Sequence, residues 1–300
     1  MKIELQRIAT GFQGEFCYTH ARGAAAPDGR AVITTQPLRL TGSDIFYGMR
    51  ELASSDGGRN WSPIREVPEL ARRPFPGHPE WEIAMADATP FYHAATGKFL
   101  LTGSSMIYCN DEFIPDPRPR HTVWSVMSPD DGTWSGYRPL MMPHDPEETF
   151  FNAAAACSQT YEQPDGGLLI PIYFMTRAEA ATPWQSCYRA AVMRCGFDGN
   201  ELRFLECGEP LSVPEPRGLC EPSIKPVTSR PATTGCTIPA RSNGGSMTAK
   251  SWATTTPSST GFPAAAACFW STPAAPETTA MYSATAHRCS WRKSTRIRCA

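Results

Sequence analysis

Apolar and polar residues alternate in short runs over residues 1–226, and turn residues interrupt these runs at close intervals. Alternation places successive side chains on opposite faces of an extended strand, so it predicts β-strands. The clearest runs span 31–40, 44–52, 87–108, 121–140, 164–175 and 188–208. Turn residues at 95–97 and 198–200 divide two of the runs into predicted hairpins. No run keeps the apolar period of a helix, and the pattern predicts an all-β chain.

The octet SSDGGRNW has the residue types of a tight turn between two strands. Its aspartate can accept backbone N–H groups, its glycines permit left-handed angles, and its tryptophan can start the next strand and cover the turn. The stretch SPDDGTW, about 74 residues further on, is similar but one residue shorter. Such recurrence is typical of propellers. We predict that eight residues form the two turns: Ser54, Asp56, Gly58, Trp61, Ser128, Asp130, Gly132 and Trp134.

The octet fits the pattern Ser-x-Asp-x-Gly-x-x-Trp, which is the Asp-box of the sialidase superfamily. Over residues 12–226 the chain resembles bacterial members of this superfamily. The resemblance implies a six-bladed β-propeller whose Asp-boxes face away from the active site. At roughly 40–50 residues per blade, residues 1–226 hold about four or five blades. We therefore expect the ring to be incomplete in this chain.

The composition changes sharply after Pro226. Residues 1–226 carry a net charge of -8, and residues 227–300 carry +7. The last 74 residues contain no leucine, and 38 of them are Ala, Ser or Thr, so they lack the side chains that build strand cores. We predict propeller blades in 1–226 and an aberrant or disordered tail in 227–300.

Three interpretations of the tail remain open: a disordered segment, a small basic domain, or a reading-frame error. Aromatic residues argue against a plain linker: Trp252, Phe262, Phe269, Trp270 and Trp291. A frame shift of two nucleotides from Trp270 onward permits a peptide rich in Leu, Val, Asp and Glu that resembles the last blade of sialidase-like proteins. We favour the reading-frame error for this reason.

The resemblance also implies a set of catalytic residues. In the superfamily an arginine trio binds the substrate carboxylate, an Asp acts as acid/base, and a Glu polarises a nucleophilic Tyr. Asp44, ten residues before the octet, and Glu221, in GLCEPSIKP, take the two acidic roles here. Pro222 keeps Glu221 extended. The alternatives are a turn aspartate that bonds its own backbone and a carboxylate at the rim.

Four further residues are candidates for substrate binding. Arg22, in YTHARGAAAP, stands where the first-blade arginine belongs, although the usual Arg-Ile-Pro is absent. Arg39 is a second candidate for the carboxylate, and Asp87 and His93 come from a stretch that recurs in sialidase-like proteins. The alternatives are outward-facing arginines and a structural histidine. Tyr282 lacks a strand pattern around it, so we do not assign it the nucleophilic role.

These assignments predict an exo-glycosidase that hydrolyses a terminal sialic-acid-like sugar, inactive in this form if the last blade is missing. The alternative is a non-catalytic carbohydrate-binding or interaction propeller. The net charge of -1 gives no reason to expect nucleic acid or membrane partners. We expect neither metal nor organic cofactor. No signal peptide pattern opens the chain and no CxxC pair occurs among its 11 cysteines, so we expect free thiols and a cytoplasmic protein.

Overall fold

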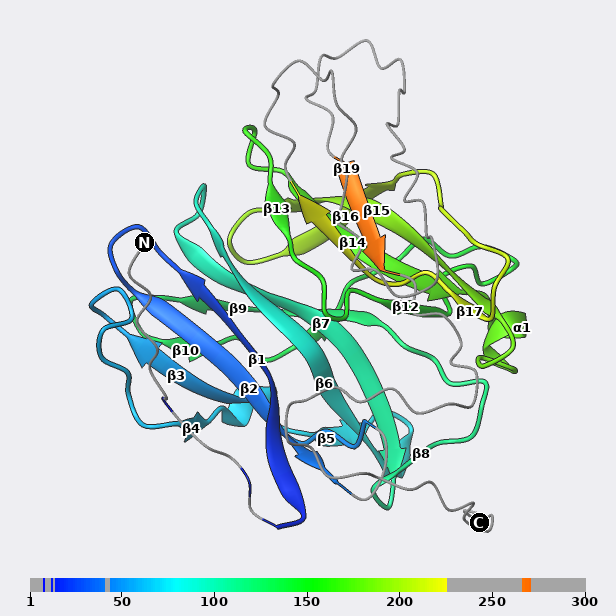
Figure 1. Cartoon of the computed structure of the whole chain (residues 1–300), viewed down its shortest axis with the longest axis horizontal. Helices are drawn as coiled ribbons and strands as arrows, with labels where there is room; N and C mark the ends of the chain where they lie inside the picture. Colours follow the sequence, from blue (N-terminus) through cyan, green and yellow to red (C-terminus); the bar gives the residue numbers. More distant parts are fainter. Residues whose placement is uncertain (1–7, 9–11, 13, 41–43, 226–265, 271–300) are drawn as a thin grey trace, which may run out of the picture.

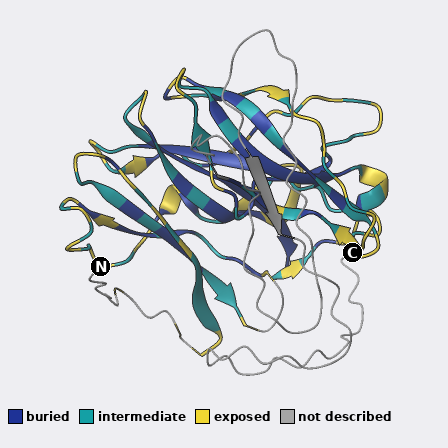
Figure 2. Cartoon of the chain, turned by 45° about the horizontal axis from the view of Figure 1, so that its top comes forward, coloured by how far each residue is buried: buried dark blue, intermediate teal, exposed yellow. Residues whose placement is uncertain are grey.

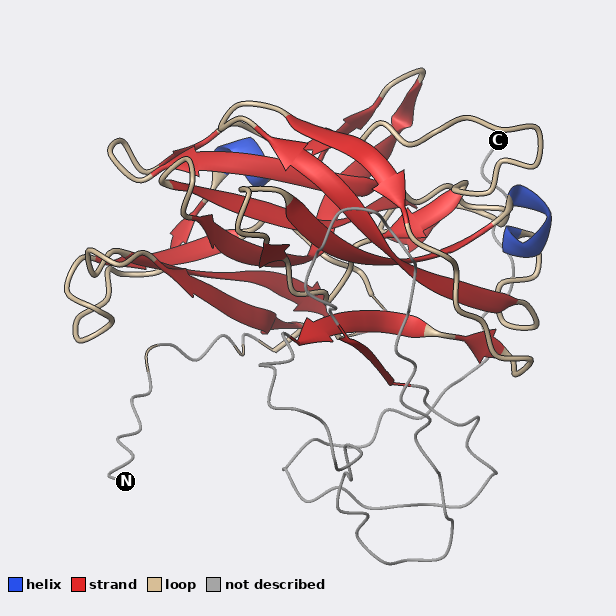
Figure 3. Cartoon of the chain, turned by 90° about the horizontal axis from the view of Figure 1, so that it is seen from above, coloured by secondary structure: helices blue, strands red, loops and turns tan. Residues whose placement is uncertain are grey.

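A computed structural model describes residues 8, 12, 14–40, 44–225 and 266–270. Regular structure in these residues is almost entirely β-sheet (Figures 1 and 3). The described exceptions are the 3-10 turn η1 (Pro68–Leu70) and the one-turn helix α1 (Arg177–Ala180). The all-β class predicted from the alternating pattern is confirmed.

The strands form three larger sheets and one strand pair. The first sheet has the order β1-β2-β3-β4, with β1 (Phe16–Ala25), β2 (Ala31–Arg39), β3 (Arg50–Ser54) and β4 (Arg65–Glu66). The second has the order β10-β9-β7-β6-β5, with β5 (Arg73–Phe75), β6 (His78–His93), β7 (Lys98–Cys109), β9 (Thr122–Ser128) and β10 (Thr133–Trp134). In this sheet β8 (Glu112–Phe113) pairs with β7, and β11 (Arg138–Pro139) pairs with β9.

The third sheet has the order β12-β14-β15-β16, with β12 (Asn152–Ala154), β14 (Leu168–Met175), β15 (Cys187–Phe197) and β16 (Leu202–Cys207). Here β13 (Tyr161–Glu162) pairs with β14, and β17 (Arg217–Gly218) pairs with β15. The strand pair consists of β18 (Cys220–Lys225) and β19 (Ala266–Trp270). We expected four or five blades in residues 1–226, and the described part of this range holds three sheets and β18. The six-blade count stays a prediction.

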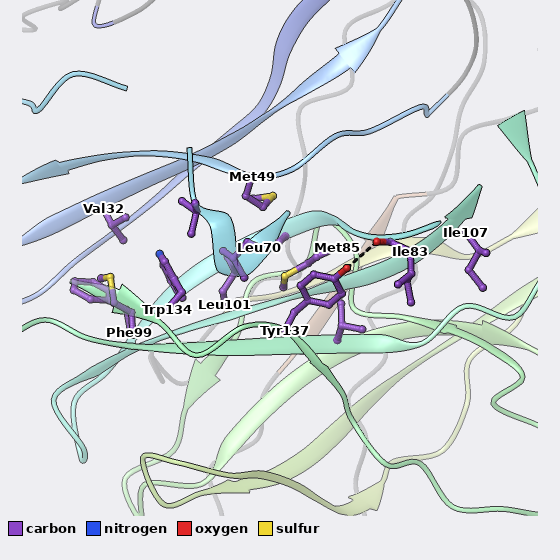
Figure 4. Close-up of a cluster of buried hydrophobic side chains, with 14 of the residues drawn as sticks. Val32, Met49, Leu70, Ile83, Met85, Phe99, Leu101, Ile107, Trp134 and Tyr137 are labelled. Atoms are coloured by element: carbon purple, nitrogen blue, oxygen red, sulfur yellow. Dashed lines mark hydrogen bonds between the residues drawn. The ribbon is translucent and has the colours of Figure 1, made fainter. Parts of the chain in front are cut away.

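The sheets pack face to face, and alternate residues of one strand serve two different cores. On β7, Phe99 and Leu101 pack toward the first sheet, whereas Leu100 packs toward the third. Figure 4 shows the first of these cores, and in Figure 2 the buried residues lie mainly in the strands, whereas the exposed residues lie mainly in the connecting loops. Strands buried on both faces read as nearly continuous apolar runs. β7 is buried from Phe99 to Cys109, although its apolar residues at the two ends are separated by a stretch of small and polar residues, 102–105.

The segment 44–52 differs from the single strand that its pattern predicts. Phe46 forms only an isolated bridge with Leu38, and the strand β3 begins at Arg50. Ile45 and Phe46 are buried in a core beside β6 and β7, whereas Met49 is buried in the core between the first two sheets. Because its apolar side chains enter two different cores, the segment cannot continue as one regular strand.

The octet forms the turn that its residue types predict. The Oδ1 atom of Asp56 accepts hydrogen bonds from the backbone N–H groups of Arg59 (3.0 Å) and Asn60 (2.9 Å). Gly57 and Gly58 take φ angles of 73° and 82°. The indole of Trp61 donates to the Gly58 carbonyl at 3.0 Å and covers the turn, although the next strand begins four residues later, at Arg65. These hydrogen bonds hold the pKa of Asp56 near 2, with the bond from the Asn60 backbone contributing most.

The shorter copy closes its turn with a different aspartate. Asp131, one residue beyond the predicted Asp130, accepts the Thr133 backbone N–H at 2.9 Å. Asp130 instead forms an ion pair with Arg30 of the neighbouring sheet at 3.0 Å. Trp134 is buried and donates to Glu51 Oε2 at 2.6 Å, again across the two sheets. This turn therefore also joins the first sheet to the second.

Asp56→Asn tests the octet turn through the pH dependence of stability. The folded-state pKa near 2 lies below the usual value of about 3.9, so Asp56 stabilises the fold above about pH 4 and loses this effect as the pH falls toward 2. We expect urea denaturation between pH 5 and 2 to show a flatter stability profile for Asp56→Asn than for the parent. Asp130→Asn removes an exposed carboxylate whose contact is with Arg30, and it is the control: its profile should lie closer to that of the parent than the profile of Asp56→Asn does. Superimposable profiles for Asp56→Asn and the parent would contradict this role.

Candidate functional site

Three strands carry the same irregularity, a bulge with a non-glycine residue in the left-handed region. The residues are His20 in β1 (φ 54°), Asp87 in β6 (φ 55°) and Glu221 in β18 (φ 52°), each at a shift in strand register. Cys157, which follows β12, has a φ of 57°. Such conformations cost of order 1–3 kcal/mol each and concentrate at functional sites, and bulges re-aim side chains. These four residues mark the candidate site.

A glycine makes the bulge in β6 possible. Gly103 in β7 lies behind it, and a Cβ atom at this position would lie 2.7 Å from the Ala86 carbonyl oxygen and 2.9 Å from the Ala88 Cα. Any side chain here would push β7 away from β6. The strand therefore needs glycine for a close approach of two backbones.

The bulges bring the first three sheets into direct contact. His20 Nδ1 lies 2.7 Å from Asp87 Oδ1, and the Asp87 carbonyl accepts the Cys157 backbone N–H at 3.0 Å. Arg22 donates through Nη1 to the Ala88 carbonyl at 3.3 Å and through Nη2 to Cys157 Sγ at 3.0 Å. One imidazole, one guanidinium and one carboxylate therefore meet where β1 and β6 adjoin the end of β12.

Arg120 brings a second guanidinium to the same region from the segment just before β9. Its Nη2 donates to Ser104 Oγ at 2.9 Å, and its Nη1 donates to the Tyr173 hydroxyl at 3.2 Å. The Tyr173 ring packs edge-on against Tyr188, with 5.0 Å between the ring centroids. Two phenols from β14 and β15 thus line the side of the site that the third sheet provides.

Electrostatics fixes the charge state of these groups. Burial by itself would raise the pKa of Asp87, but the hydrogen bond from His20 and the charges of Arg120 and Arg22 outweigh it, so the pKa is lowered and the carboxylate is ionised. Burial would lower the pKa of Arg120, but Tyr173, Tyr188 and Asp87 raise it. The site thus combines a fixed anion with two guanidinium groups.

The Cys157 thiol and the Tyr173 phenol are neutral at physiological pH. Burial raises the pKa of Cys157 to about 12, and the carboxylates of Asp87 and Glu221 add to this effect while Arg22 opposes it. Burial also raises the pKa of Tyr173, against the influence of Arg120. These groups can donate hydrogen bonds, but they are not preformed nucleophiles.

The structure brings three of the sequence-predicted residues together. Arg22, Asp87 and Glu221 all lie close enough to Cys157 to influence its pKa. Glu221 is exposed, which places it at the edge of the group and not at its centre. The extended conformation that we expected Pro222 to impose on Glu221 is wrong, because the bulge in β18 takes Glu221 to a φ of 52°. Asp44 is on the neighbouring β2–β3 connection, where its carbonyl accepts the Tyr108 hydroxyl at 2.6 Å. Burial raises the pKa of Tyr108, and the nearby charges of Asp44 and Asp87 add to this effect.

Arg39 and His93 make their contacts elsewhere. Arg39, at the end of β2, lies 3.5 Å from Asp111. His93 is buried at the end of β6, where Nδ1 lies 2.8 Å from Thr96 Oγ1 and Nε2 lies 3.0 Å from the Gly166 carbonyl oxygen. These contacts correspond to the structural histidine that the sequence left as an alternative. Tyr282 lies outside the described residues.

Sequence analysis missed five residues of the site: His20, Arg120, Cys157, Tyr173 and Tyr188. His20 stands two residues before Arg22 and carried a usable signal, because an inward-facing strand residue beside a candidate arginine is itself a candidate. The others had no local signal. Their role follows from contacts between segments that are distant in the sequence.

Two cavities, of about 410 and 580 Å³, open at the octet end of the first sheet. Arg22 lines the smaller cavity together with Gly58 and Trp61, and neither cavity is lined by His20 or Asp87. We place the candidate site at the bulges because charge and backbone strain coincide there. In the part of the chain that the structure describes, no cluster of His, Cys, Asp and Glu could hold a metal ion. No described helix is long and apolar enough to cross a membrane.

Asp87→Asn tests the charge balance of the site. The amide keeps the shape of the carboxylate but leaves His20, Arg22 and Arg120 without their anion, so we expect a loss of about 1–3 kcal/mol in the free energy of unfolding at pH 7. Because the pKa of Asp87 is lowered, its ionised form stabilises the fold above the unfolded-state value near 4, and the difference from the parent should shrink as the pH falls below it. Denaturant titration at pH 7 and at lower pH measures the loss in unfolding free energy and its change with pH. Asp28→Asn, at an exposed pair with Arg30, is the control, and an equal loss in both variants would contradict the assignment.

No family model and no curated protein matches this sequence. Solved structures with distant similarity include a Hadza microbial sialidase (14% identity, TM-score 0.47) and a Trypanosoma rangeli sialidase in complex with sialic acid (14%, 0.46). A polysaccharide lyase of the ulvan lyase type is also similar (14%, 0.40). These matches cover 69%, 70% and 63% of this chain, respectively. The chain spans only 39%, 32% and 43% of those proteins.

Proposed function

We propose that this chain derives from a sialidase-like exo-glycosidase and that its bulge cluster binds an acidic sugar. The observation that carries the proposal is that Arg22 and Arg120 lie near Asp87, which is ionised and stands in the strained bulge of β6, where Arg22 also bonds the Ala88 carbonyl. Guanidinium groups suit a sugar carboxylate, because their planar fork matches its two oxygens. The two Asp-box turns and the all-β sheets support the same assignment.

Both arginines keep donors for a ligand. Arg22 uses one hydrogen bond from each of two nitrogens, to the Ala88 carbonyl and to Cys157. Arg120 likewise donates one hydrogen bond through Nη2 to Ser104 and one through Nη1 to Tyr173. A guanidinium has five N–H donors. The existing hydrogen bonds therefore orient each group and leave further donors for a carboxylate.

In the proposed reaction Asp44 protonates the leaving oxygen, and Glu221 polarises a tyrosine that traps the oxocarbenium-like sugar. Water then releases the sugar with retention of configuration. Asp87 is unsuited to the acid role, because its lowered pKa keeps it ionised. The tyrosine belongs to the last blade in the resemblance, and residues 227–300 do not offer its sequence pattern. We therefore expect little turnover from this form of the chain.

A second candidate is a carbohydrate-binding propeller without catalytic activity. The observation that favours it is that Asp87, the carboxylate nearest to the two arginines, contacts His20 and stays ionised, so it is a fixed anion and not a proton donor. Such a protein would bind the acidic sugar but would not cleave its glycosides. Fold similarity alone does not distinguish the two functions.

Binding of N-acetylneuraminic acid, measured by calorimetry, tests the acidic-sugar site, and a fluorogenic sialoside separates turnover from binding. We expect the parent to bind the acid and not galactose. Arg120→Lys and Arg22→Lys keep the charge but lose the planar fork, so each should weaken binding by about tenfold or more. Arg50→Lys, whose parent side chain pairs with Glu66 at 2.6 Å in the first sheet, is the control and should bind as the parent does. Absence of binding by the parent contradicts the proposal.

We also propose that residues 227–300 follow a reading-frame error, as their composition indicates. Within this range the structure describes only β19, which pairs with β18. Sequencing of the coding DNA around the Lys225 codon tests the idea directly. A frame-restored protein should melt more cooperatively and at higher temperature than the present chain, because restored strands would cover exposed sheet edges. Equal, cooperative unfolding of the two proteins would contradict it.

A further inference from the structure

A second group of charged residues lies beside the bulge cluster, around the side chain of Arg72. This side chain is only 8% exposed, and its guanidinium lies 4.1 Å from the centroid of the Tyr47 ring and 4.4 Å from that of the Tyr108 ring. Its Nη1 pairs with Asp111 Oδ1 at 2.5 Å and with Glu82 Oε2 at 3.1 Å. Its Nη2 has no hydrogen-bond acceptor among the described residues, and the two ring faces compensate this buried charge.

The same group holds the backbone of residues 44–47. Arg72 Nε donates to the Phe46 carbonyl at 2.7 Å. The Tyr108 hydroxyl donates to the Asp44 carbonyl at 2.6 Å and accepts the Phe46 backbone N–H at 3.1 Å. The Tyr47 hydroxyl donates to Asp111 Oδ2 at 2.8 Å. Three side-chain hydrogen bonds thus hold the backbone of Asp44 and Phe46. The backbones of Ile45 and Tyr47 bond to the end of β2.

The held segment reaches the bulge cluster through one ring contact. The Phe46 ring lies 5.4 Å from the His20 imidazole, centroid to centroid, with the planes tilted by 44°. His20 in turn contacts Asp87. Asp44, two residues before Phe46, has a φ of 60°, so the segment begins in a strained conformation that needs outside support.

We propose that Arg72, Tyr108 and Asp111, hereafter the Arg72 cluster, position residues 44–47 over His20 and thereby set Asp44 for its role at the sugar site. This inference rests on the proposed function for the role of Asp44. The positioning itself rests only on the hydrogen bonds to the segment and on the Phe46–His20 contact. The three members are positioning residues, since they act through the segment.

Tyr108→Phe is the sharpest test, because it keeps the ring beneath Arg72 and removes only the hydroxyl that binds Asp44 and Phe46. Tyr137→Phe is the matched control. Tyr137 is equally buried, and its hydroxyl also donates to a backbone carbonyl, that of Ile83 at 2.7 Å (Figure 4). Both variants lose one buried hydroxyl, but only Tyr108 holds residues 44–47.

Two measurements on the full chain decide the matter: amide hydrogen exchange of residues 44–47 and the affinity for N-acetylneuraminic acid. We expect Tyr108→Phe to speed exchange in this segment by about tenfold and to weaken binding by a similar factor, each equivalent to about 1.4 kcal/mol. Tyr137→Phe should leave both unchanged, even if its melting temperature falls as far. If Tyr108→Phe does not fold, Asp111→Asn replaces it, because the Asp111 side chain is more exposed than that of Arg72. Its exchange rates in residues 44–47 and its sugar affinity should change in the same direction.

The outcomes separate the inference from the proposed function. Equal exchange of residues 44–47 in the parent and both variants overturns the positioning role. Faster exchange with unchanged sugar affinity overturns the link to the sugar site. If the parent does not bind N-acetylneuraminic acid, the proposed function fails, and the exchange rates alone then decide whether the Arg72 cluster holds the segment.

Discussion

The structure depends on face-to-face packing of successive sheets through strands that are buried on both sides. In β14, Ile172 and Phe174 enter the core shared with the second sheet, whereas Tyr173 and Met175 face the core toward β18. A strand of this kind cannot slip by one residue without exchanging the contents of two cores. The register of each central strand is therefore tightly determined, and with it the position of every side chain at the strand's inner end.

Bulges turn this rigid packing into a site. A regular strand would point alternate side chains into the two cores, whereas His20, Asp87 and Glu221 stand at register shifts with left-handed backbone angles. The strain is tolerated because the flanking strands are held by their cores. Polar side chains can then gather between the sheets without disturbing the apolar layers. The contact of His20 with Asp87 and the nearby charges of Arg120 and Arg22 offset the cost of burying the carboxylate.

The octet turn with its shorter copy and the Arg72 cluster support opposite ends of this arrangement. The octet turn contacts the β1–β2 turn, where Gly57 donates to the Gly29 carbonyl at 2.8 Å. The Arg72 cluster holds the β2–β3 connection, at the other end of β2. Structural bonds at one end thus fix the sheets relative to each other, while those at the other end hold the segment that carries Asp44.

The sequence by itself determined the all-β class, the hairpins and the bonding of Asp56 in the octet, because these depend on residues a few positions apart. It also selected Arg22, Asp87 and Glu221, which the fold brings together. Only the tertiary structure decided that Asp131 accepts the backbone bond of the second turn. It also decided that His93 contacts Thr96 in the turn between β6 and β7. It alone showed Arg120 at the site. Contacts such as Arg22 with Cys157, 135 residues apart, arise when sheets pack, and no local pattern records that packing.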